Sequence, residues 1–249
     1  MEVEQIYGLI GYPLIHSFSK TFFNEKFESE KISAEYINFE ISDISLLKEI
    51  IAEETRLRGL NVTIPYKEAV IPYLNEMDET ARLIGAVNVI KFIQNKGKLI
   101  LKGYNSDIIG FTDSIKPLLT RQHKYALILG TGGASKAVWH GLESLDITPT
   151  LVSRTPKEGV LTYKDLTPEI INKYKVIVNT TPVGMYPHVD ECPDIPYTYL
   201  TEDHLIYDLL YNPDETLFMK KAKERGATVK NGLEMLLLQA FAAWDIWQK

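Results

Sequence analysis

Residues 125–136 read YALILGTGGASK, and the interpretation of the rest of the chain starts from them. Five mostly apolar residues run into a glycine cluster, and a helix-forming run to about Leu145 follows at once. A buried strand that turns sharply into a helix directs bare backbone N–H groups and the positive helix end at one point, which suits a phosphate. Gly130 permits the tight turn, Gly132 allows close approach of the backbone, and Ser135 stands where a third Gly or Ala is usual. The stretch predicts a dinucleotide-binding turn, with an ordinary glycine-rich turn as the alternative.

The chain after this turn alternates between apolar runs and helical patterns. We expect three further strands, at 150–153, 176–179 and 205–209. A helix from 215 to 225, closed by Gly226, follows the last of them. Strands that alternate with helices at this spacing are typical of a parallel, doubly wound sheet. The second half is therefore predicted to be a Rossmann-like domain.

The first half also predicts an α/β fold, because short strands are separated by helices. Ser19 and Asp43 are the expected helix caps, and another helix is expected after Asp78. The expected strands span 6–11, 34–39, 59–64, 88–93 and 99–102. A turn at 95–97 separates the last two of them.

Composition excludes several classes of function. The chain has 249 residues, 45% hydrophobic and 24% charged, with a net charge of −6, which argues against non-specific binding to nucleic acid or to an anionic membrane. Cys192 is the only cysteine, so neither an internal disulfide nor a cysteine metal cluster is expected, and no metal is predicted. An acidic N-terminus and the lack of a long apolar run predict a cytoplasmic protein.

Polar residues at the predicted strand ends are candidates for ligand binding, because ligands of open α/β sheets bind there. Asn61 and Thr63 alternate and are expected to share one face of their strand, with Lys67 just beyond its end. A lysine and an aspartate that meet form a proton-transfer pair, and Asp107 is the candidate partner. The alternatives are a solvated surface lysine and a helix N-cap, and spacing alone does not bring the two together.

The last helix, expected over 233–247, carries few polar residues. Glu234 and Asp245 fall on nearly the same line of the helix, which should face water. Gln239 falls on the apolar side, where a buried amide needs a partner. Either it bonds a neighbouring backbone group, or it faces a polar cavity and holds a ligand.

Several motifs, taken in order, are similar to those of the shikimate dehydrogenase family. Residues 11–19 (GYPLIHSFS) resemble its opening substrate-binding motif, and residues 61–68 (NVTIPYKE) resemble its catalytic motif. The glycine loop matches as well, as do residues 85–88, 105–107, 153–155, 179–185, 207–211 and 232–240. The resemblance covers almost the whole chain.

The resemblance implies reversible, NADP-linked reduction of 3-dehydroshikimate to shikimate, a small-molecule substrate. It implies Lys67 and Asp107 as the catalytic pair, and substrate contacts from Ser17, Ser19, Asn61, Thr63, Asn88, Tyr211 and Gln239. It places NADP (NADPH) along Gly130, Thr131, Gly132, Gly133, Ala134 and Ser135, with further contacts from Ser153, Arg154, Thr155, Asn179, Thr180, Thr181, Met185, Leu209 and Gly232. We expect Lys67 to act as the acid in reduction and as the base in oxidation, and Asp107 to position it.

The expected cofactor preference depends on the residues after the second strand. An acidic residue about 20 positions after the glycine loop usually holds the ribose hydroxyls of NAD. Ser153 and Arg154 occupy that region instead, and a guanidinium suits a 2′-phosphate. NADPH is therefore predicted over NADH, with Lys157 assisting; an arginine solvated at a strand end is the alternative.

Three features depart from the family pattern or stay open. Lys20 replaces a usual proline, which we interpret as tolerated at a helix start. The segment between Arg154 and Val176 is shorter than usual, so its helix is expected to be cut down. His16 is a second candidate acid or base, and we favour a structural or gating role for it.

The predicted architecture has two α/β domains. Residues 1–104 with 233–249 would bind and transform the substrate, residues 105–232 would bind NADP, and the active site would lie in the cleft between them. The alternatives are an NAD-using quinate/shikimate dehydrogenase of the same family and a non-catalytic dinucleotide sensor. A monomer or homodimer without nucleic-acid or membrane partners is expected.

Overall fold

The computed structural model describes residues 3–14 and 17–249, and it divides into two compact units. The first unit comprises Met1–Ser106 and Ala240–Lys249, and the second comprises Asp107–Gln239. His16, the second candidate acid or base, lies outside the described residues. The assignment of a substrate to residues 1–104 with 233–249 and of NADP to 105–232 stays a prediction.

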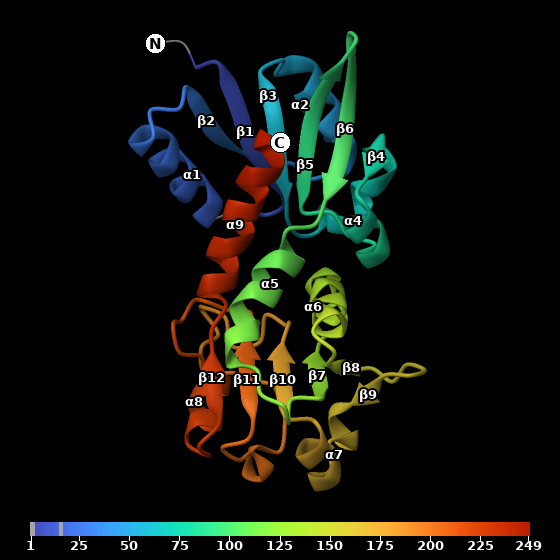
Figure 1. The fold of residues 1–249 in the computed structure, drawn as a ribbon, viewed down its shortest axis with the longest axis vertical. Helices are drawn as coiled ribbons and strands as arrows, with labels where there is room; N and C mark the ends of the chain where they lie inside the picture. Colours follow the sequence, from blue (N-terminus) through green and yellow to red (C-terminus); the bar gives the residue numbers. More distant parts are fainter. Residues whose placement is uncertain (1–2, 15–16) are drawn as a thin grey trace. The chain divides into compact units, whose positions relative to one another are not determined.

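The first unit is built on a six-stranded mixed sheet in the order β2-β1-β3-β5-β6-β4 (Figure 1). Its first three strands are parallel, whereas β5 runs antiparallel to both β3 and β6. The strands are β1 (Gln5–Gly11), β2 (Ala34–Glu40), β3 (Leu57–Val62), β4 (Glu76–Met77), β5 (Val89–Asn95) and β6 (Lys98–Tyr104). One edge of this sheet therefore collects the ends of β1, β2 and β3 together with the beginning of β5.

Short helices connect these strands, and one of the predicted caps was wrong. The first helix begins after Ser17, whose extended backbone lets its side chain accept from the Lys20 N–H at 3.2 Å, whereas Ser19 already lies in the first turn. A helix follows Asp78 as predicted, with Asp78 as its cap, and Asp43 caps a 3-10 turn. The elements are α1 (Phe18–Ser29), η1 (Ile44–Leu46), α2 (Leu47–Glu53), α3 (Tyr66–Ala69), η2 (Ile71–Tyr73) and α4 (Glu79–Ile84).

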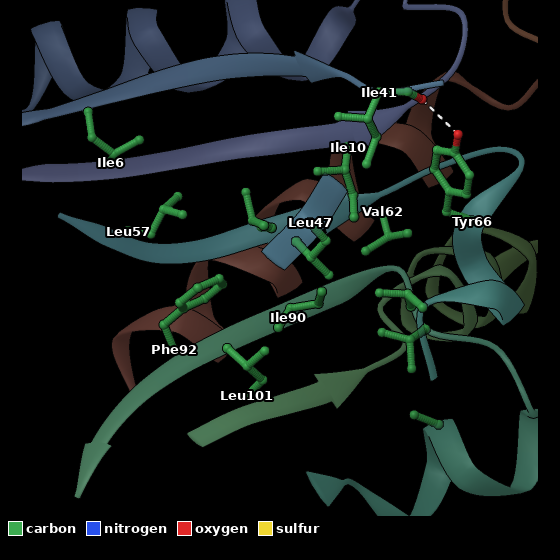
Figure 2. Close-up of a cluster of buried hydrophobic side chains, with 14 residues drawn as sticks. Ile6, Ile10, Ile41, Leu47, Leu57, Val62, Tyr66, Ile90, Phe92 and Leu101 are labelled. Atoms are coloured by element: carbon green, nitrogen blue, oxygen red, sulfur yellow. Dashed lines mark hydrogen bonds between the residues drawn. The ribbon is translucent and has the colours of Figure 1, made fainter. Parts of the chain in front are cut away.

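The core of the first unit fills both faces of the sheet. Figure 2 shows aliphatic side chains of β1, β3, β5 and β6 gathered with Leu47 of α2 and with Tyr66 at the start of α3. An aromatic cluster on α1 and the end of α9 packs elsewhere, around Tyr7, Phe23, Tyr36 and Trp247. Trp247 approaches Gly59 so closely that a Cβ there would lie 2.1 Å from the indole nitrogen, so this strand position requires glycine.

The second unit is a six-stranded, all-parallel sheet in the order β12-β11-β10-β7-β8-β9 (Figure 1). The doubly wound sheet predicted for this half is confirmed. The chain order reverses between β7 and β10, and ligands of such sheets bind outside the strand ends at this point. The strands are β7 (Tyr125–Leu129), β8 (Thr148–Ser153), β9 (Leu161–Thr162), β10 (Val176–Asn179), β11 (Leu205–Asp208) and β12 (Thr228–Lys230).

Helices pack on this sheet, and two of them lie side by side. A Cβ added to Gly141 in α6 would lie 2.8 Å from the Phe111 ring of α5, so glycine permits this close packing. The helix predicted to be cut down, α7, has six residues. The elements are α5 (Asp107–Ile115), η3 (Lys116–Leu118), α6 (Gly133–Ser144), η4 (Tyr163–Asp165), α7 (Pro168–Lys173), η5 (Tyr197–Tyr199), α8 (Leu217–Lys223) and α9 (Leu233–Gln248), whose residues from Ala240 onward belong to the first unit.

Two strand predictions differ from the structure. The strand predicted over 59–64 ends at Val62, so Thr63 no longer shares a strand face with Asn61, although its N–H still donates to the Ile10 carbonyl at 2.9 Å. The reason is the turn that Pro65 begins, because proline cannot donate to a sheet ladder. The two-residue strands β4 and β9 and the three-residue β12 were not predicted, since runs this short carry no detectable periodicity.

No helix among the described residues is long and apolar enough to cross a membrane.

Candidate functional site

Lys67 is held by the backbone and by its neighbour in the short helix α3. The carbonyl of Lys67 accepts from the Val87 N–H at 2.7 Å. Tyr66 is buried beside it, and its hydroxyl donates to the Ile41 carbonyl at 2.7 Å, the dashed line in Figure 2. A helix of four residues is not stable by itself, so these anchors fix the position from which the lysine side chain starts.

Asn61 and Asn88 lie at the same edge of the first unit's sheet. Asn61 pairs with Val89 in the ladder, and its side-chain nitrogen donates to the Asn88 carbonyl at 3.3 Å. Both asparagines are almost fully buried. Buried amides in a cluster of this kind provide directed donors and acceptors for a polar ligand.

The Asn88 side chain binds the segment that precedes α5. Its oxygen accepts from the Ser106 N–H at 2.7 Å, and its nitrogen donates to the Ser106 hydroxyl at 3.0 Å. Asp107 follows Ser106 in the chain, is the first residue of α5 and the first of the second unit, and is 8% exposed. The Asn88 side chain, itself a candidate for substrate binding, thus fixes the backbone just before Asp107.

The candidate serines of the opening loop have different roles. Ser17 caps α1 through its hydroxyl, whereas Ser19 is hydrogen-bonded to the phenol of Tyr36. The Leu14 N–H, earlier in this loop, donates to a Glu40 carboxylate oxygen at 3.0 Å. Leu14 is therefore tied to the end of β2.

The glycine loop of the second unit has the geometry expected from the sequence. Gly130 follows β7 with φ +111, a conformation that L side chains rarely adopt, and a Cβ there would lie 2.7 Å from the Thr180 hydroxyl. A Cβ on Gly132 would meet nothing within 4 Å, so the N-terminus of the twelve-residue helix α6 is open to close approach. The Ser135 hydroxyl donates to the Gly132 carbonyl at 2.6 Å and stabilises the turn. This arrangement suits a pyrophosphate.

A buried carboxylate organises the ends of β10 and β11. Asp208 is fully buried and accepts from the Asn179 amide at 3.0 Å, from the Thr216 hydroxyl at 2.7 Å and from the Leu210 N–H at 3.1 Å. Burial raises the pKa of Asp208 to about 6, although these three donors oppose the shift. The oxygen of Asn179 in turn accepts from the N–H and the hydroxyl of Thr181. One carboxylate thus supports the cofactor candidates Asn179 and Thr181.

Residues 154–157, which directly follow β8, include no acidic side chain. Ser153 ends the strand, and its hydroxyl accepts from the Thr155 N–H at 3.1 Å. Arg154, Thr155 and Lys157 are exposed. Two cations beside a buried serine suit a phosphate ester better than a free ribose hydroxyl.

The remaining candidates of the second unit lie on its loops and on α9. Gly232 packs so closely against Leu209 that a Cβ would lie 2.0 Å from the Leu209 carbonyl oxygen. Met185 and Tyr211 are exposed. Gln239 is half-buried, and its amide donates to the Leu236 carbonyl at 2.9 Å, which is the backbone bond given above as one of two alternatives.

Sequence reasoning missed two residues that connect the candidates, Tyr36 and Asp208. Asp208 stood within a quoted motif, and a carboxylate that ends an apolar strand was the available signal. Tyr36 gave no signal, because an aromatic residue in a strand is ordinary. Among the described residues, no cluster of three His, Cys, Asp or Glu side chains offers a metal site.

Comparison with known proteins connects this geometry to one family. The profile of the shikimate dehydrogenase substrate binding domain matches residues 9–90. The curated shikimate dehydrogenase (NADP(+)) of Aquifex aeolicus is 40% identical and covers 98% of this chain and 91% of its own length. A crystal structure of shikimate dehydrogenase from Aquifex aeolicus superposes with a TM-score of 0.84 at 39% identity, over 98% of this chain and 92% of that one. The Thermus thermophilus enzyme in complex with NADP(H) and shikimate gives 0.84 at 29% identity, over 98% and 93%.

Proposed function

Because this chain belongs to the shikimate dehydrogenase family, we propose that it catalyses the reversible NADP-linked reduction of 3-dehydroshikimate to shikimate. It is an NADP-dependent oxidoreductase of the shikimate pathway, which leads to chorismate and the aromatic amino acids. The observation that carries the assignment is the open helix N-terminus behind Gly130 and Gly132, in a chain that also retains Lys67 and Asp107.

The cofactor assignment is supported by the donors and the space that the second unit offers. Gly132 leaves room for phosphates at the helix end, and the positive φ of Gly130 turns the chain toward it. Asn179, Thr180 and Thr181 line the neighbouring strand end, and Met185, Leu209 and Gly232 lie on the loops beyond it. When bound, the reduced cofactor supplies a hydride. Arg154, with Lys157, would hold the 2′-phosphate that distinguishes NADPH from NADH.

The proton chemistry is assigned to Lys67 and Asp107. Reduction of a ketone leaves a developing alkoxide, which needs a proton and a nearby positive charge. The Lys67 ammonium provides both, and it takes the proton back during oxidation of shikimate. Asp107 would orient the lysine and a substrate hydroxyl.

Substrate recognition is assigned to a set of polar side chains. We propose that Asn61, Asn88 and Thr63 contact the ring hydroxyls and that the Ser17 and Ser19 loop contacts the carboxylate end. The burial of both asparagines supports this, because a buried amide discriminates strongly against a ligand that lacks its partner. Tyr211 and Gln239 complete the proposed set.

The partners and the compartment follow from this chemistry. The ligands are a small hydroxy acid and NADP, and the net charge of −6 gives no support for a nucleic-acid partner. We propose a cytoplasmic enzyme that acts as a monomer or homodimer, since the reaction draws on a soluble NADPH pool.

The experiment that tests the function is NADP⁺ reduction by the purified protein with shikimate, followed by nicotinamide absorbance. Quinate and NAD⁺ are run alongside as matched substrates. Turnover restricted to shikimate with NADP⁺ is the expected result. Comparable turnover with quinate or NAD⁺ would indicate the broader subfamily, and tight NADPH binding without turnover would contradict an enzymatic function.

A further inference from the structure

The phenol of Tyr36 lies between two residues that the proposed function assigns to the substrate. Its hydroxyl donates to the Asn61 side-chain oxygen at 2.7 Å and is also hydrogen-bonded to Ser19. Tyr36 belongs to β2, Ser19 to α1 and Asn61 to β3, so one buried hydroxyl joins three elements. Tyr36 itself is fully buried and does not reach solvent.

The contacts of Asn61 show which of its two side-chain atoms is the oxygen and which is the nitrogen. Its second partner is the backbone carbonyl of Asn88, which can only accept, so the atom that approaches it must be the nitrogen. The oxygen then faces Tyr36, whose hydroxyl is the donor. Among the described residues, the Asn88 carbonyl is the acceptor found for that nitrogen, so its second hydrogen is available to a ligand.

The ring of Tyr36 is held too firmly to follow a rotation of Asn61. It stacks on Phe23 with ring centroids 4.9 Å apart and an interplanar angle of 12°. The Asn24 side chain bonds the Tyr36 backbone on both sides, accepting from its N–H at 2.9 Å and donating to its carbonyl at 3.1 Å. Turning the Asn61 amide over would place its oxygen against the Asn88 carbonyl, at the cost of one buried hydrogen bond, and would force the phenol to change from donor to acceptor.

We propose that Tyr36 is a positioning residue for substrate recognition, because its hydroxyl locks the Asn61 carboxamide with the nitrogen presented to the substrate. The ligand group recognised there is an oxygen that accepts a hydrogen bond, such as a ring hydroxyl. This inference rests on the proposed function, since it deepens the role given to Asn61. Tyr36 touches neither substrate nor cofactor in this scheme and acts through its neighbour.

The test compares Tyr36→Phe with Tyr7→Phe. Tyr7 is a matched control: it lies in the same aromatic cluster and is almost fully buried, but its hydroxyl donates to Gln5 at 3.0 Å and has no bond to Asn61. We expect Tyr36→Phe to raise the dissociation constant and the KM of shikimate by roughly fivefold, because one hydrogen bond is worth about 1 kcal/mol. The KM of NADP⁺ should stay unchanged in both variants, and Tyr7→Phe should leave the shikimate values within about twofold.

A double-mutant cycle with Asn61→Ala separates positioning from a general loss of order. If Tyr36 acts through Asn61, Tyr36→Phe should have little further effect on shikimate binding once the carboxamide is gone. Calorimetry of shikimate binding is measured beside turnover, so that binding and chemistry are read separately.

Two outcomes would overturn the inference. One is an unchanged shikimate dissociation constant in Tyr36→Phe while the unaltered enzyme turns shikimate over. The other is a full effect of Tyr36→Phe in the Asn61→Ala background. A protein that binds shikimate but does not oxidise it would instead contradict the proposed function, and the inference would still be decided by the calorimetry.

Discussion

In each unit of the molecule, one buried polar side chain holds some of the candidate residues in place, but the two side chains are chemically opposite. In the first unit, Tyr36 donates a hydrogen bond to Asn61, and burial raises the pKa of this phenol well above its usual value. In the second unit, Asp208 accepts three hydrogen bonds, and burial raises its pKa to about 6. The first centre is neutral at any physiological pH, whereas the second changes charge near pH 6.

The difference shows how burial acts on groups of opposite character. Burial disfavours the charged form of any acid, so it keeps a phenol protonated and functional as a donor. The same burial opposes the carboxylate form, which is the form that accepts from Asn179 and Thr216. The hydrogen bond from Tyr36 to Asn61 should therefore be independent of pH, whereas the hydrogen bonds that Asp208 accepts should depend on pH.

The largest expected effect separates chemistry from positioning within the first unit. Lys67→Ala should lower kcat by roughly 10²–10⁴ with little change in KM, because proton transfer is lost and the binding groups stay. Tyr36→Phe should show the reverse split, with a higher shikimate KM. Steady-state kinetics with shikimate and NADP⁺ measure both, and near-normal turnover by Lys67→Ala would remove it from the catalytic role.

The next largest effect concerns the free energy of unfolding, which should depend on pH through Asp208 but not through Tyr36. The pKa of Asp208 is about 6 in the folded chain and 3.8 as its ordinary value. A raised pKa means that the group's contribution to stability is present below pH 3.8 and is lost as pH rises through about 6. The loss amounts to roughly 3 kcal/mol, at about 1.4 kcal/mol for each pH unit.

Urea unfolding of the unaltered chain and of Asp208→Asn between pH 4 and pH 8 measures this effect. The free energy of unfolding of the unaltered chain relative to the variant should fall across that range. Burial lowers the pKa of His123 and His204, which acts in the opposite direction, but both chains carry these histidines and the difference cancels them. Tyr36→Phe should lower stability by about 1 kcal/mol equally at every pH. If the difference in free energy of unfolding between the unaltered chain and Asp208→Asn did not change with pH, the proposed contrast between Tyr36 and Asp208 would be wrong.

The smallest effect concerns the surface of the second unit. Arg154→Ala should lower the preference for NADPH over NADH by roughly tenfold, the value of a charge-assisted contact of about 1.4 kcal/mol. Because Arg154 is exposed, the melting temperature should not change, unlike that of Asp208 variants. The ratio of kcat/KM for the two cofactors is the measurement, and an unchanged ratio would assign the preference to other residues.

Local patterns in the sequence were sufficient to predict much of the fold. The alternation of apolar runs and helical patterns over 125–225 was sufficient for the parallel sheet, because strand and helix periods are properties of neighbouring residues. Gly130 was identified as a turn residue because few other residues adopt φ +111. The family motifs indicated which polar residues to consider, Lys67 and Asp107 foremost.

Where local rules competed, the sequence alone was insufficient. Ser17 and Ser19 are equally good caps by residue type, and the backbone at Ser17 decided between them. The antiparallel direction of β5 depends on which strands pair across the sheet, and residue spacing does not encode that choice.

The sequence by itself therefore determined the longer helices and strands, the glycine turn and the identity of the family. Only the tertiary structure decided which buried groups hold the candidate residues in place. Tyr36 and Asn61 are 25 residues apart, and Asn179 and Asp208 are 29 apart, so no local pattern links either pair. Their hydrogen bonds exist because the folded sheet brings distant residues together, Asn179 and Asp208 from neighbouring strands and Tyr36 and Asn61 from strands on either side of β1. The sheet also excludes water, which makes an unpaired polar group costly.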